Sequence, residues 1–535
     1  MSTIETVRPS ASCVAEQPLL PVVGGDLHVP LLDGSTVRFA NLDYAATAPA
    51  LAAVAERVNR VLPFSGSVHR GAGLPSQVSS ALYEAARRRV GAALGARADD
   101  LVVFTRNTTD ATNLLAAAIP VGAGDVVTLD LEHHATLLPW GRRAPSGVAS
   151  AGPDGPAAER EARGATSGGP RPAHRCVPHA GTIDETFARL EAELRRGHVA
   201  LVALTGASNV TGELLPVARA AALAHAHGAR LFVDAAQLAP HRAVDLVALG
   251  ADWLALSGHK LYAPYGAGVL VGRRDWLDAA EPYLAGGGAV REVGTTALTD
   301  PAADAGARAG GPPISETVPT GARVPVPATG AVAGDGRTRT TTVDWATGAA
   351  RHEAGTPNLA GAVAIAAAFE VLGALDADAR EDHEEALRLR VLEGLDGIDG
   401  VHALRIWDED DVEAIGVVAF AVDGYAPGHV GAYLSAEHGI GVRDGRFCAH
   451  PLLARFGRPE GALRASFGVG SRAEDADRLV EALRRLVDEG PRHEYCETAA
   501  GWVPVDDTRD LAAWTGLDLG LEDGVAVVRS PCGNG

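Results

Sequence analysis

Short apolar segments that alternate with helix-like segments constrain this chain more than any other feature of its sequence. The clearest apolar segments lie at 101–104, 125–131, 199–204, 231–233 and 253–256. Segments of this length and apolar content are typical of strands buried on both faces of a parallel sheet. Because helical patterns separate them, the sequence predicts an α/β fold in which helices cover a mainly parallel sheet.

Polar side chains follow these segments, at the point where each strand is expected to end. The cluster RNTTD at 106–110 follows the first segment and precedes a helical pattern, with its Thr and Asp residues as candidate caps. Asn209 follows the third segment, Asp234 ends the fourth and Ser257 ends the fifth. Ligands of open α/β sheets bind at the carboxyl ends of the strands, so we expect the functional site there.

Lys260 is the only lysine of the chain, and the other 46 of its 47 basic residues are arginine. A coding sequence rich in G and C replaces lysine by arginine wherever a positive charge is sufficient. Arginine stays protonated in proteins, whereas lysine can lose its proton and act as a nucleophile or base. We therefore expect Lys260 to have a chemical role, the alternative being the chance survival of a surface lysine.

The length of 535 residues is too great for one compact core and predicts at least two domains. We expect an N-terminal arm (1–35), a large domain (36–296), a smaller α/β domain (343–490) and a C-terminal extension of unknown role (491–535). Two segments rich in Ala, Gly, Pro and Thr, at 143–175 and 297–342, lack a periodic apolar face and are expected to be flexible insertions. In the smaller domain the pattern predicts a helix at 359–375, a strand at 416–422 and a helix at 474–487.

Charge and cysteine usage exclude several classes of function. The 67 acidic and 47 basic residues give a formal net charge of −20, which disfavours a nucleic-acid or anionic-membrane partner. The sequence contains no long uncharged apolar stretch, so we expect no membrane span, and the N-terminus lacks the pattern of a signal peptide. The five cysteines show no CxxC spacing, which disfavours a disulfide framework or a zinc site and favours a reducing cytoplasm.

Lys260 and Asp234 form the pair that pyridoxal phosphate (PLP) requires. A lysine binds the cofactor aldehyde as a Schiff base, and a carboxylate keeps the pyridine nitrogen protonated. The turn at Thr108 and Thr109 opens a helix whose N–H groups and hydroxyls suit a phosphate, and Ser257 and His259 could add donors. Taken separately, Asp234 and Lys260 could form an ordinary ion pair, and the polar residues at the helix start could be ordinary caps. Taken together, these residues favour a PLP site.

In the motifs given below, the chain resembles the class V, fold-type I PLP-dependent enzymes, and among them the cysteine desulfurases that handle sulfur or selenium. The matching motifs span about 40–490 and occur in the family's order. They are LDYAATAP (42–49), SVHRGAG (67–73), FTRNTTDATNL (104–114), LEHHATLLPW (131–140), SNVTGELLP (208–216), VDAAQLAPH (233–241), SGHKLYAPYGAGVL (257–270), GGGA (286–289), EAGTPN (353–358), VRDGRFCAHP (442–451) and RASFG (464–468). The resemblance implies a large domain with a mainly parallel seven-stranded sheet and a smaller C-terminal domain.

The resemblance also assigns cofactor contacts. Lys260 corresponds to the Schiff-base lysine that moves the Cα proton, and Asp234 to the acid that pairs with the pyridinium nitrogen. Gln237 corresponds to a residue that contacts the phenolic oxygen of the cofactor, and His133 to the residue stacked on the cofactor ring. A metal site is the alternative for the run Glu132-His133-His134, but adjacent histidines lack the usual spacing of metal ligands. The phosphate is expected to contact Thr109, Ser257 and His259, with Thr108 nearby and Asn209 beside cofactor and substrate. Thr356 resembles a threonine that reaches the phosphate of the other subunit, which implies a homodimer.

Cys448 determines the expected subclass. A thiol beside arginines and a cofactor could act as a thiolate, and the resemblance implies that it takes the sulfur of L-cysteine as a persulfide while L-alanine is released. Arg464 corresponds to the arginine that binds the substrate carboxylate and Arg443 to a second arginine near it, unless both are ordinary surface arginines. The remaining contacts implied near the sulfur are His69 and Arg70, and a sulfur-acceptor protein is an implied partner. A buried, inert cysteine is the alternative for Cys448.

Three departures from the family pattern leave alternatives open. Phe447 stands where many relatives have histidine, Gly470 and Ser471 stand where many have a Tyr-Asn pair, and the insertion at 297–342 replaces a short segment. Another class V enzyme, either a C–S lyase acting on a cysteine conjugate or an aminotransferase, is therefore the second hypothesis. A catalytically silent sulfur carrier or interaction protein is the third.

Overall fold

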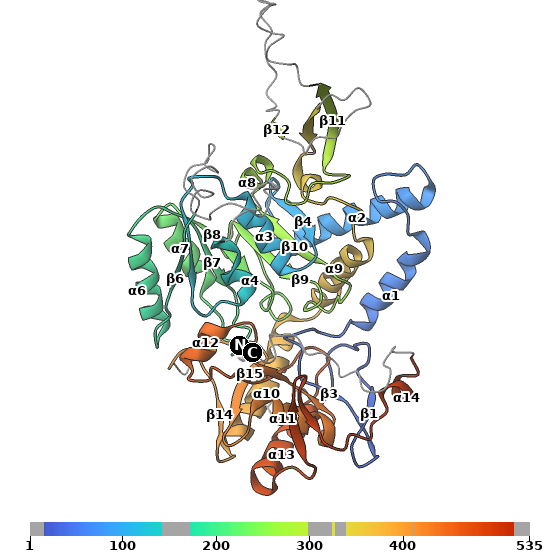
Figure 1. Cartoon of the computed structure of the whole chain (residues 1–535), viewed down its shortest axis with the longest axis vertical. Helices are drawn as coiled ribbons and strands as arrows, with labels where there is room; N and C mark the ends of the chain where they lie inside the picture. The colour runs from blue at the N-terminus through green and yellow to red at the C-terminus, as the bar shows by residue number, and fades with distance from the viewer. Residues whose placement is uncertain (1–14, 142–171, 298–323, 327–338, 410, 518–535) are drawn as a thin grey trace, which may run out of the picture.

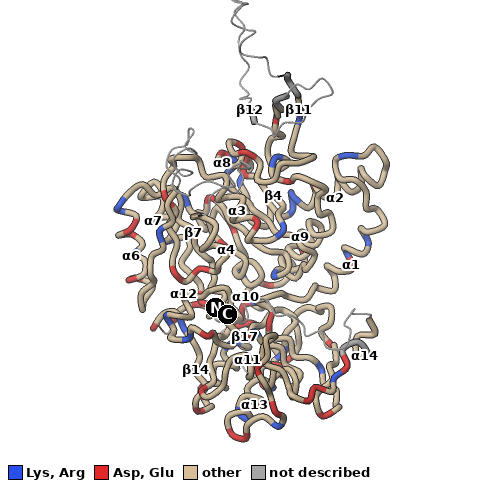
Figure 2. Tube along the Cα trace, in the orientation of Figure 1, with Lys and Arg blue, Asp and Glu red and all other residues tan. Residues whose placement is uncertain are grey.

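The computed structural model describes residues 15–141, 172–297, 324–326, 339–409 and 411–517. A large sheet with its helices occupies one half of the molecule, and a smaller sheet with the C-terminal helices occupies the other (Figure 1). Figure 2 shows acidic and basic residues interspersed over both halves. The predicted segment 143–175 lies mostly outside the described residues, as does most of 297–342.

The large sheet has seven strands in the order β4-β10-β9-β8-β7-β5-β6. β10 runs antiparallel to both of its neighbours, β4 and β9, while the other pairings are parallel. The strands are β4 (Leu101–Thr105), β5 (Asp125–Leu129), β6 (His174–Val177), β7 (Val199–Thr205), β8 (Arg230–Asp234), β9 (Trp253–Ser257) and β10 (Gly268–Gly272). The mainly parallel, seven-stranded sheet is confirmed.

Every residue of β7, β9 and β10 is buried, which explains their continuous apolar sequences. β6 and β10 are additional to the strands predicted from the apolar segments, and β6 begins inside the segment expected to be a flexible insertion. Because β10 is antiparallel to both neighbours, β4 and β9 point the same way. The carboxyl ends of β4, β5, β7, β8 and β9 therefore lie along one edge of the sheet.

Helices cover both faces of this sheet. α9 is almost wholly apolar and packs with α1 and α2 in the main core, whereas α3 and α8 belong to the core of the opposite face. The helices of this half are α1 (Ala52–Val61), α2 (Leu74–Ala93), α3 (Thr108–Ala118), α4 (His134–Leu137), α6 (Ile183–Leu194), α7 (Val217–Ala226), α8 (Arg274–Ala279) and α9 (Leu359–Leu372), with short 3-10 helices at Leu62–Phe64, Pro139–Gly141 and Gly348–Arg351.

The smaller half is a four-stranded antiparallel sheet in the order β14-β15-β18-β17 with its own core. Its strands are β14 (Val401–Ala403), β15 (Val417–Val422), β17 (Arg443–Gly445) and β18 (Ala462–Ser466), and its helices are α10 (Ala377–Asp396), α11 (Pro427–His438), α12 (His450–Arg455) and α13 (Ala473–Glu489). α13 is amphipathic and places its apolar stripe on this sheet, as its sequence pattern predicts.

The N-terminal segment joins the smaller half rather than extending away from it. Ala40 and Leu42 lie in the core of that half, and β3 (Ala40–Asn41) pairs in parallel with β16 (Ile440–Gly441). β1 (His28–Pro30) and β2 (Thr36–Arg38) form a hairpin across the expected boundary at 35. Pairing of β1 with β2 and of β3 with β16 ties the described part of this segment down, which the sequence pattern did not indicate.

Two small sheets complete the described structure. β11 (Val290–Ala297), β12 (Val324–Val326) and β13 (Arg339–Trp345) form an antiparallel sheet at the end of the molecule farthest from the smaller half (Figure 1). The described parts of the insertion expected at 297–342 thus include strands. In the C-terminal extension, β19 (Tyr495–Thr498) and β20 (Gly501–Pro504) form a hairpin packed on α11, followed by α14 (Leu511–Thr515).

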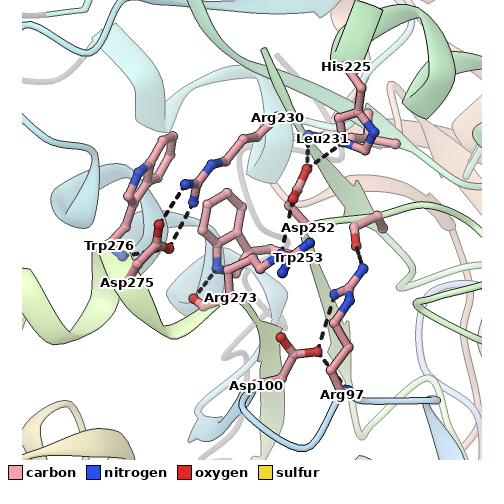
Figure 3. A network of polar contacts seen from close by, with 11 residues as sticks. Arg97, Asp100, His225, Arg230, Leu231, Asp252, Trp253, Arg273, Asp275 and Trp276 are labelled. Carbon is pink, nitrogen blue, oxygen red and sulfur yellow. Dashed lines mark hydrogen bonds and ion pairs between the residues drawn. The ribbon is translucent and has the colours of Figure 1, made fainter. Parts of the chain in front are cut away.

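At the edge of the large sheet opposite the carboxyl ends, a polar network ties the strands together (Figure 3). The Asp252 carboxylate accepts the N–H of Leu231 at 3.0 Å and contacts the His225 ring at 2.8 Å. Arg230 forms two hydrogen bonds with Asp275, and its guanidinium lies over the rings of Trp253 and Trp276. This network fixes the amino-terminal ends of β8 and β9, so their opposite ends are presented at defined positions.

Within the described ranges, no single helix has the length and apolarity to cross a membrane. α9 and α10 meet those criteria only as a pair, bent by 93°.

Candidate active site

A cavity of about 310 Å³ lies at the carboxyl edge of the large sheet, where the smaller half meets it. Twelve of the fifteen residues predicted for the site line this cavity: Thr108, Thr109, His133, Asn209, Asp234, Gln237, Ser257, His259, Lys260, Arg443, Cys448 and Arg464. They come from both halves of the chain. Their convergence on one cavity follows from the shared direction of the strands that precede most of them.

Asp234 ends β8 and Lys260 follows β9, so neighbouring strands bring both to the cavity. Asp234 is buried, and its carboxylate accepts the Thr136 hydroxyl at 2.7 Å and the Ala236 N–H at 2.9 Å. Neutral donors thus hold the carboxylate. Burial raises the pKa of Asp234 and lowers the pKa of Lys260 to about 8. A lysine with this pKa is partly neutral near physiological pH and can act as a nucleophile.

The N-terminus of α3 faces the cavity at Thr108. Asn107 caps this helix by accepting the N–H of Asp110 at 2.9 Å, so the expectation that Thr or Asp caps it was wrong. The cap is Asn107 because its extended backbone turns its side chain back onto the first turn. Ser257 Oγ accepts the Thr108 N–H and bonds the Thr108 hydroxyl, both at 2.8 Å.

This arrangement places helix N–H groups and hydroxyls together, as an anion requires. Thr109 is exposed beside them. His259 Nδ1 lies 3.0 Å from the Thr47 hydroxyl, and burial lowers the pKa of His259 to about 4. A neutral His259 can therefore share a hydrogen bond with Thr47.

Two further side chains form the wall around Lys260. His133 accepts the N–H of Ala135 at 3.0 Å, and burial lowers the pKa of its ring to about 3, so the ring is neutral. Gln237 is buried and donates through Nε2 to the carbonyl of Ala45 at 2.8 Å. Its Oε1 has no hydrogen-bond partner among the described residues. A buried orphan acceptor in a cavity wall indicates a place for a bound polar group.

The smaller half contributes two arginines and the cysteine. Arg464 in β18 is buried and Arg443 in β17 is half-buried, so neither is an ordinary surface arginine. Arg464 donates to the carbonyl of Asn209 at 2.7 Å and pairs with Asp43 at 3.0 Å. Cys448 lies half-buried between β17 and α12, and its carbonyl accepts the N–H of His134 at 2.8 Å. The cavity thus contains both a thiol and a cationic group that is suited to binding a carboxylate.

Three predicted residues do not lie in this cavity within one chain. His69 and Arg70 line a second cavity of about 850 Å³, and Thr356 is exposed. The guanidinium of Arg70 donates to the carbonyls of Gly287 at 2.8 Å and Gly355 at 2.6 Å, which holds it in that second region. The expected position of His69 and Arg70 beside the sulfur is therefore not found within a single chain.

The structure also identifies polar residues that the sequence analysis did not single out. Asp43 and Thr47 belong to LDYAATAP, and Thr136 lies three residues after His133. Glu132 is fully buried and accepts the N–H of Thr205 at 2.7 Å. Burial, reinforced by Asp234, raises the pKa of Glu132 well above its ordinary value, which favours its neutral form. The spacing alone did not indicate these contacts, because each joins segments distant in sequence.

In the described part of the chain, no group of three or more His, Cys, Asp or Glu side chains could hold a metal ion.

Comparison with known proteins places these features in a family. The family model for aminotransferase class-V matches residues 40–149, 176–333 and 329–479. A cysteine desulfurase of Dickeya dadantii is 34% identical over 452 residues, covering 84% of this chain and 92% of the relative. A probable cysteine desulfurase 2 of Mycobacterium leprae is 33% identical over 462 residues, covering 84% of this chain and 92% of the relative.

Solved structures give the same result. The crystal structure of the cysteine desulfurase CsdA from Escherichia coli, in its S-sulfonic acid form, has a TM-score of 0.61 at 31% identity and covers 84% of this chain and 94% of its own. The apo structure of a cysteine desulfurase from Thermococcus onnurineus NA1 has a TM-score of 0.63 at 28% identity, with the same coverage. The similarity extends over both halves of the fold.

Proposed function

Because the chain belongs to the aminotransferase class-V family, we propose that it is a PLP-dependent cysteine desulfurase. In this proposal it converts L-cysteine to L-alanine and retains the sulfur as a persulfide on Cys448. The observation that carries the proposal is the single cavity lined by Lys260, Asp234, Arg464 and Cys448. An amine, a buried acid, a carboxylate-binding cation and a thiol are the groups that this reaction requires.

The residues of the cavity fit PLP. Lys260 Nζ suits the aldehyde, Asp234 suits the pyridine nitrogen, and the N-terminus of α3 with Ser257 and His259 suits the phosphate. The orphan Oε1 of Gln237 offers a partner to a ring hydroxyl. When bound, the cofactor supplies an electron-accepting ring that makes the Cα–H bond of the substrate acidic.

The chain's own groups supply proton transfer and orientation. Arg464 binds the substrate carboxylate, and this fixes the Cα–H bond relative to Lys260. Lys260 Nζ, with its lowered pKa, is able to accept the Cα proton and return one later. The carboxylate of Asp234, oriented by Thr136 and Ala236, holds the proton of the ring nitrogen. Neutral His133 forms part of the wall on the ring face.

Cys448 receives the sulfur. Its Sγ attacks the substrate sulfur, the S–S bond forms as the substrate C–S bond breaks, and the electron pair left on the substrate is protonated to give alanine. The balance is L-cysteine plus the Cys448 thiol giving L-alanine plus the Cys448 persulfide. The terminal sulfur then passes to an acceptor, for which a protein partner is proposed.

We further propose that the enzyme is a homodimer with shared sites. His69, Arg70 and Thr356 are exposed and lie outside the cavity of their own chain, so they are available to a partner subunit's cavity. Mixing inactive K260A with a variant impaired at Thr356 or Arg70 should restore part of the activity in heterodimers. Absence of any restoration in a verified heterodimer would contradict shared sites.

Assay of alanine, pyruvate and sulfide together tests the function. Purified protein loaded with PLP and given L-cysteine should produce alanine, and mass spectrometry should find the extra sulfur on the Cys448 peptide. C448S should lose sulfur release, whereas C496S, a substitution at an exposed cysteine of the C-terminal extension, should retain it. Full sulfur release by C448S would contradict the proposal.

Measuring ammonia and the cofactor absorbance in the same incubation separates the other hypotheses. Pyruvate with ammonia would indicate a C–S lyase, and a pyridoxamine form with a keto acid would indicate an aminotransferase. A protein without cofactor absorbance would indicate a catalytically silent protein.

A further inference from the structure

The loop that carries Cys448 has an unusual backbone. Phe447 and Cys448 both have a φ of 53°, in the left-handed region that non-glycine residues seldom adopt. The carbonyl of Phe447 accepts the side-chain amide of Asn209 at 2.8 Å, and the carbonyl of Cys448 accepts the N–H of His134 at 2.8 Å. Contacts with the loop after β7 and with α4 thus hold both strained residues, and strain of this kind is typical of functional sites.

The ring of Phe447 lies against the guanidinium of Arg464. The guanidinium carbon is 5.2 Å from the ring centroid, within the range of a cation–π interaction. Both residues are buried, Phe447 with 4% and Arg464 with 3% of its surface exposed. An interaction of this type is strongest where water is excluded.

Within the part of the chain that the structure describes, the other contacts of Arg464 leave its Nε without a hydrogen-bond partner and use only one N–H of each Nη atom. The two Nη atoms donate to the Asn209 carbonyl and to Asp43. Burial opposes the charge and lowers the pKa of Arg464, so a carboxylate brought to this guanidinium would relieve an unfavourable state. Asp43 keeps 28% of its side chain exposed and is an incomplete counter-ion.

We propose that Phe447 is a positioning residue that makes the site selective for amines carrying an α-carboxylate. The guanidinium carbon of Arg464 lies over the Phe447 ring, and this contact fixes the guanidinium in the cavity while its Nε–H, unpaired among the described residues, stays available to the substrate. The contact between Phe447 and Arg464 thereby links the loop that presents Cys448 to the group that recognises the carboxylate. This inference rests on the proposed function, in which Arg464 binds the substrate carboxylate.

The nature of the side chain at 447 matters for this role. Phenylalanine has no donor or acceptor, so it cannot compete with a substrate carboxylate for the guanidinium. A histidine there could become charged and repel Arg464. An aliphatic residue of similar size would fill the space but provide no π-face.

Binding of two matched ligands tests the inference. L-alanine and ethylamine differ by the carboxylate alone, and the cofactor absorbance of the loaded enzyme reports the dissociation constant of each. In F447L, which keeps an apolar side chain of similar size, L-alanine should bind about tenfold more weakly, and ethylamine should bind within about twofold of wild type. F447Y, which keeps the π-face, should bind L-alanine nearly as well as wild type.

Equal weakening of both ligands in F447L would overturn the inference, since it would show a merely structural role. Unchanged L-alanine binding in F447L would overturn it too. Should F447L fail to fold, F447M is measured in its place against F447Y.

The inference and the proposed function can fail separately. Wild-type enzyme that binds L-alanine no better than ethylamine would overturn the inference, whereas persulfide formation on Cys448 would still support the desulfurase. Carboxylate-selective binding that depends on Phe447, without any persulfide on Cys448, would support the inference and contradict the desulfurase.

Discussion

At the scale of single residues, Lys260 differs from an ordinary surface lysine by its pKa of about 8. Because only the neutral amine attacks an aldehyde, the rate at which apo-protein binds PLP should rise about tenfold per pH unit below pH 8 and level off above it. Stopped-flow absorbance at several pH values measures this rate. A rate that continues to rise to pH 10 would show that burial does not lower the pKa of this lysine.

K260R keeps a positive charge but removes the titratable amine. Because arginine stays protonated, this variant should show no covalent cofactor band and a loss of activity of about 10²- to 10⁴-fold. Borohydride reduction followed by peptide mapping should label wild type at Lys260 and leave K260R unlabelled. A pyridoxyl adduct elsewhere in wild type would contradict the assignment.

Thr136 affects the cofactor through Asp234. In T136V the buried carboxylate loses its 2.7 Å donor, which raises its pKa further and weakens its hold on a protonated ring nitrogen. We expect PLP affinity to fall about tenfold, measured by fluorescence titration of apo-protein. T186V is the matched control, since the Thr186 hydroxyl is also buried but bonds Ala180 and Thr182 away from the cavity. Equal loss of affinity in both variants would contradict the role of Thr136.

At the scale of elements, the N-terminus of α3 depends on one cap. N107A removes the acceptor of the Asp110 N–H and should cost about 1 kcal/mol of stability together with a loss of phosphate affinity. D376A removes the equivalent cap of α10 in the smaller half. D376A should lower the free energy of unfolding by a similar amount and leave cofactor affinity unchanged. Urea unfolding and titration with inorganic phosphate distinguish the two effects, and unchanged phosphate binding in N107A would contradict the anion site.

At the scale of the whole molecule, buried histidines set the response to acid. Burial lowers the pKa of His133 to about 3 and of His259 to about 4, and it also lowers the pKa of several others, among them His352 and His383. Below about pH 6.5 the unfolded chain therefore binds protons that the native protein does not bind. Stability is lost as pH falls towards the native pKa values, by up to about 1.4 kcal/mol per pH unit for each fully buried histidine.

Urea unfolding of apo-protein at a fixed protein concentration tests this expectation. The free energy of unfolding should fall by several kcal/mol between pH 7 and pH 5 and change little between pH 7 and pH 8. A flat profile down to pH 5 would show that these rings are accessible to protons in the native state.

Much of the site could be predicted from the sequence because its residues lie in local patterns. Asp234 and Ser257 end apolar strands, and Lys260 is the only lysine, so each is conspicuous by itself. The contacts of Asp43 with Arg464 and of Thr136 with Asp234 could not be predicted in this way. Each joins residues about 100 or more positions apart, and pairings of this range depend on how helices and strands pack.

The sequence by itself determined the α/β character, the strands that end at the cavity and the chemical nature of the groups there, because apolar periodicity and residue type are local properties. Only the tertiary structure decided that β4 lies beside the antiparallel β10, that the N-terminal segment joins the smaller half, and that His69, Arg70 and Thr356 lie outside their own chain's cavity. The tertiary structure also set the protonation of Lys260, His133 and Glu132. The physical reason is that strand order and desolvation depend on which surfaces are buried together, and one segment's sequence does not contain that information.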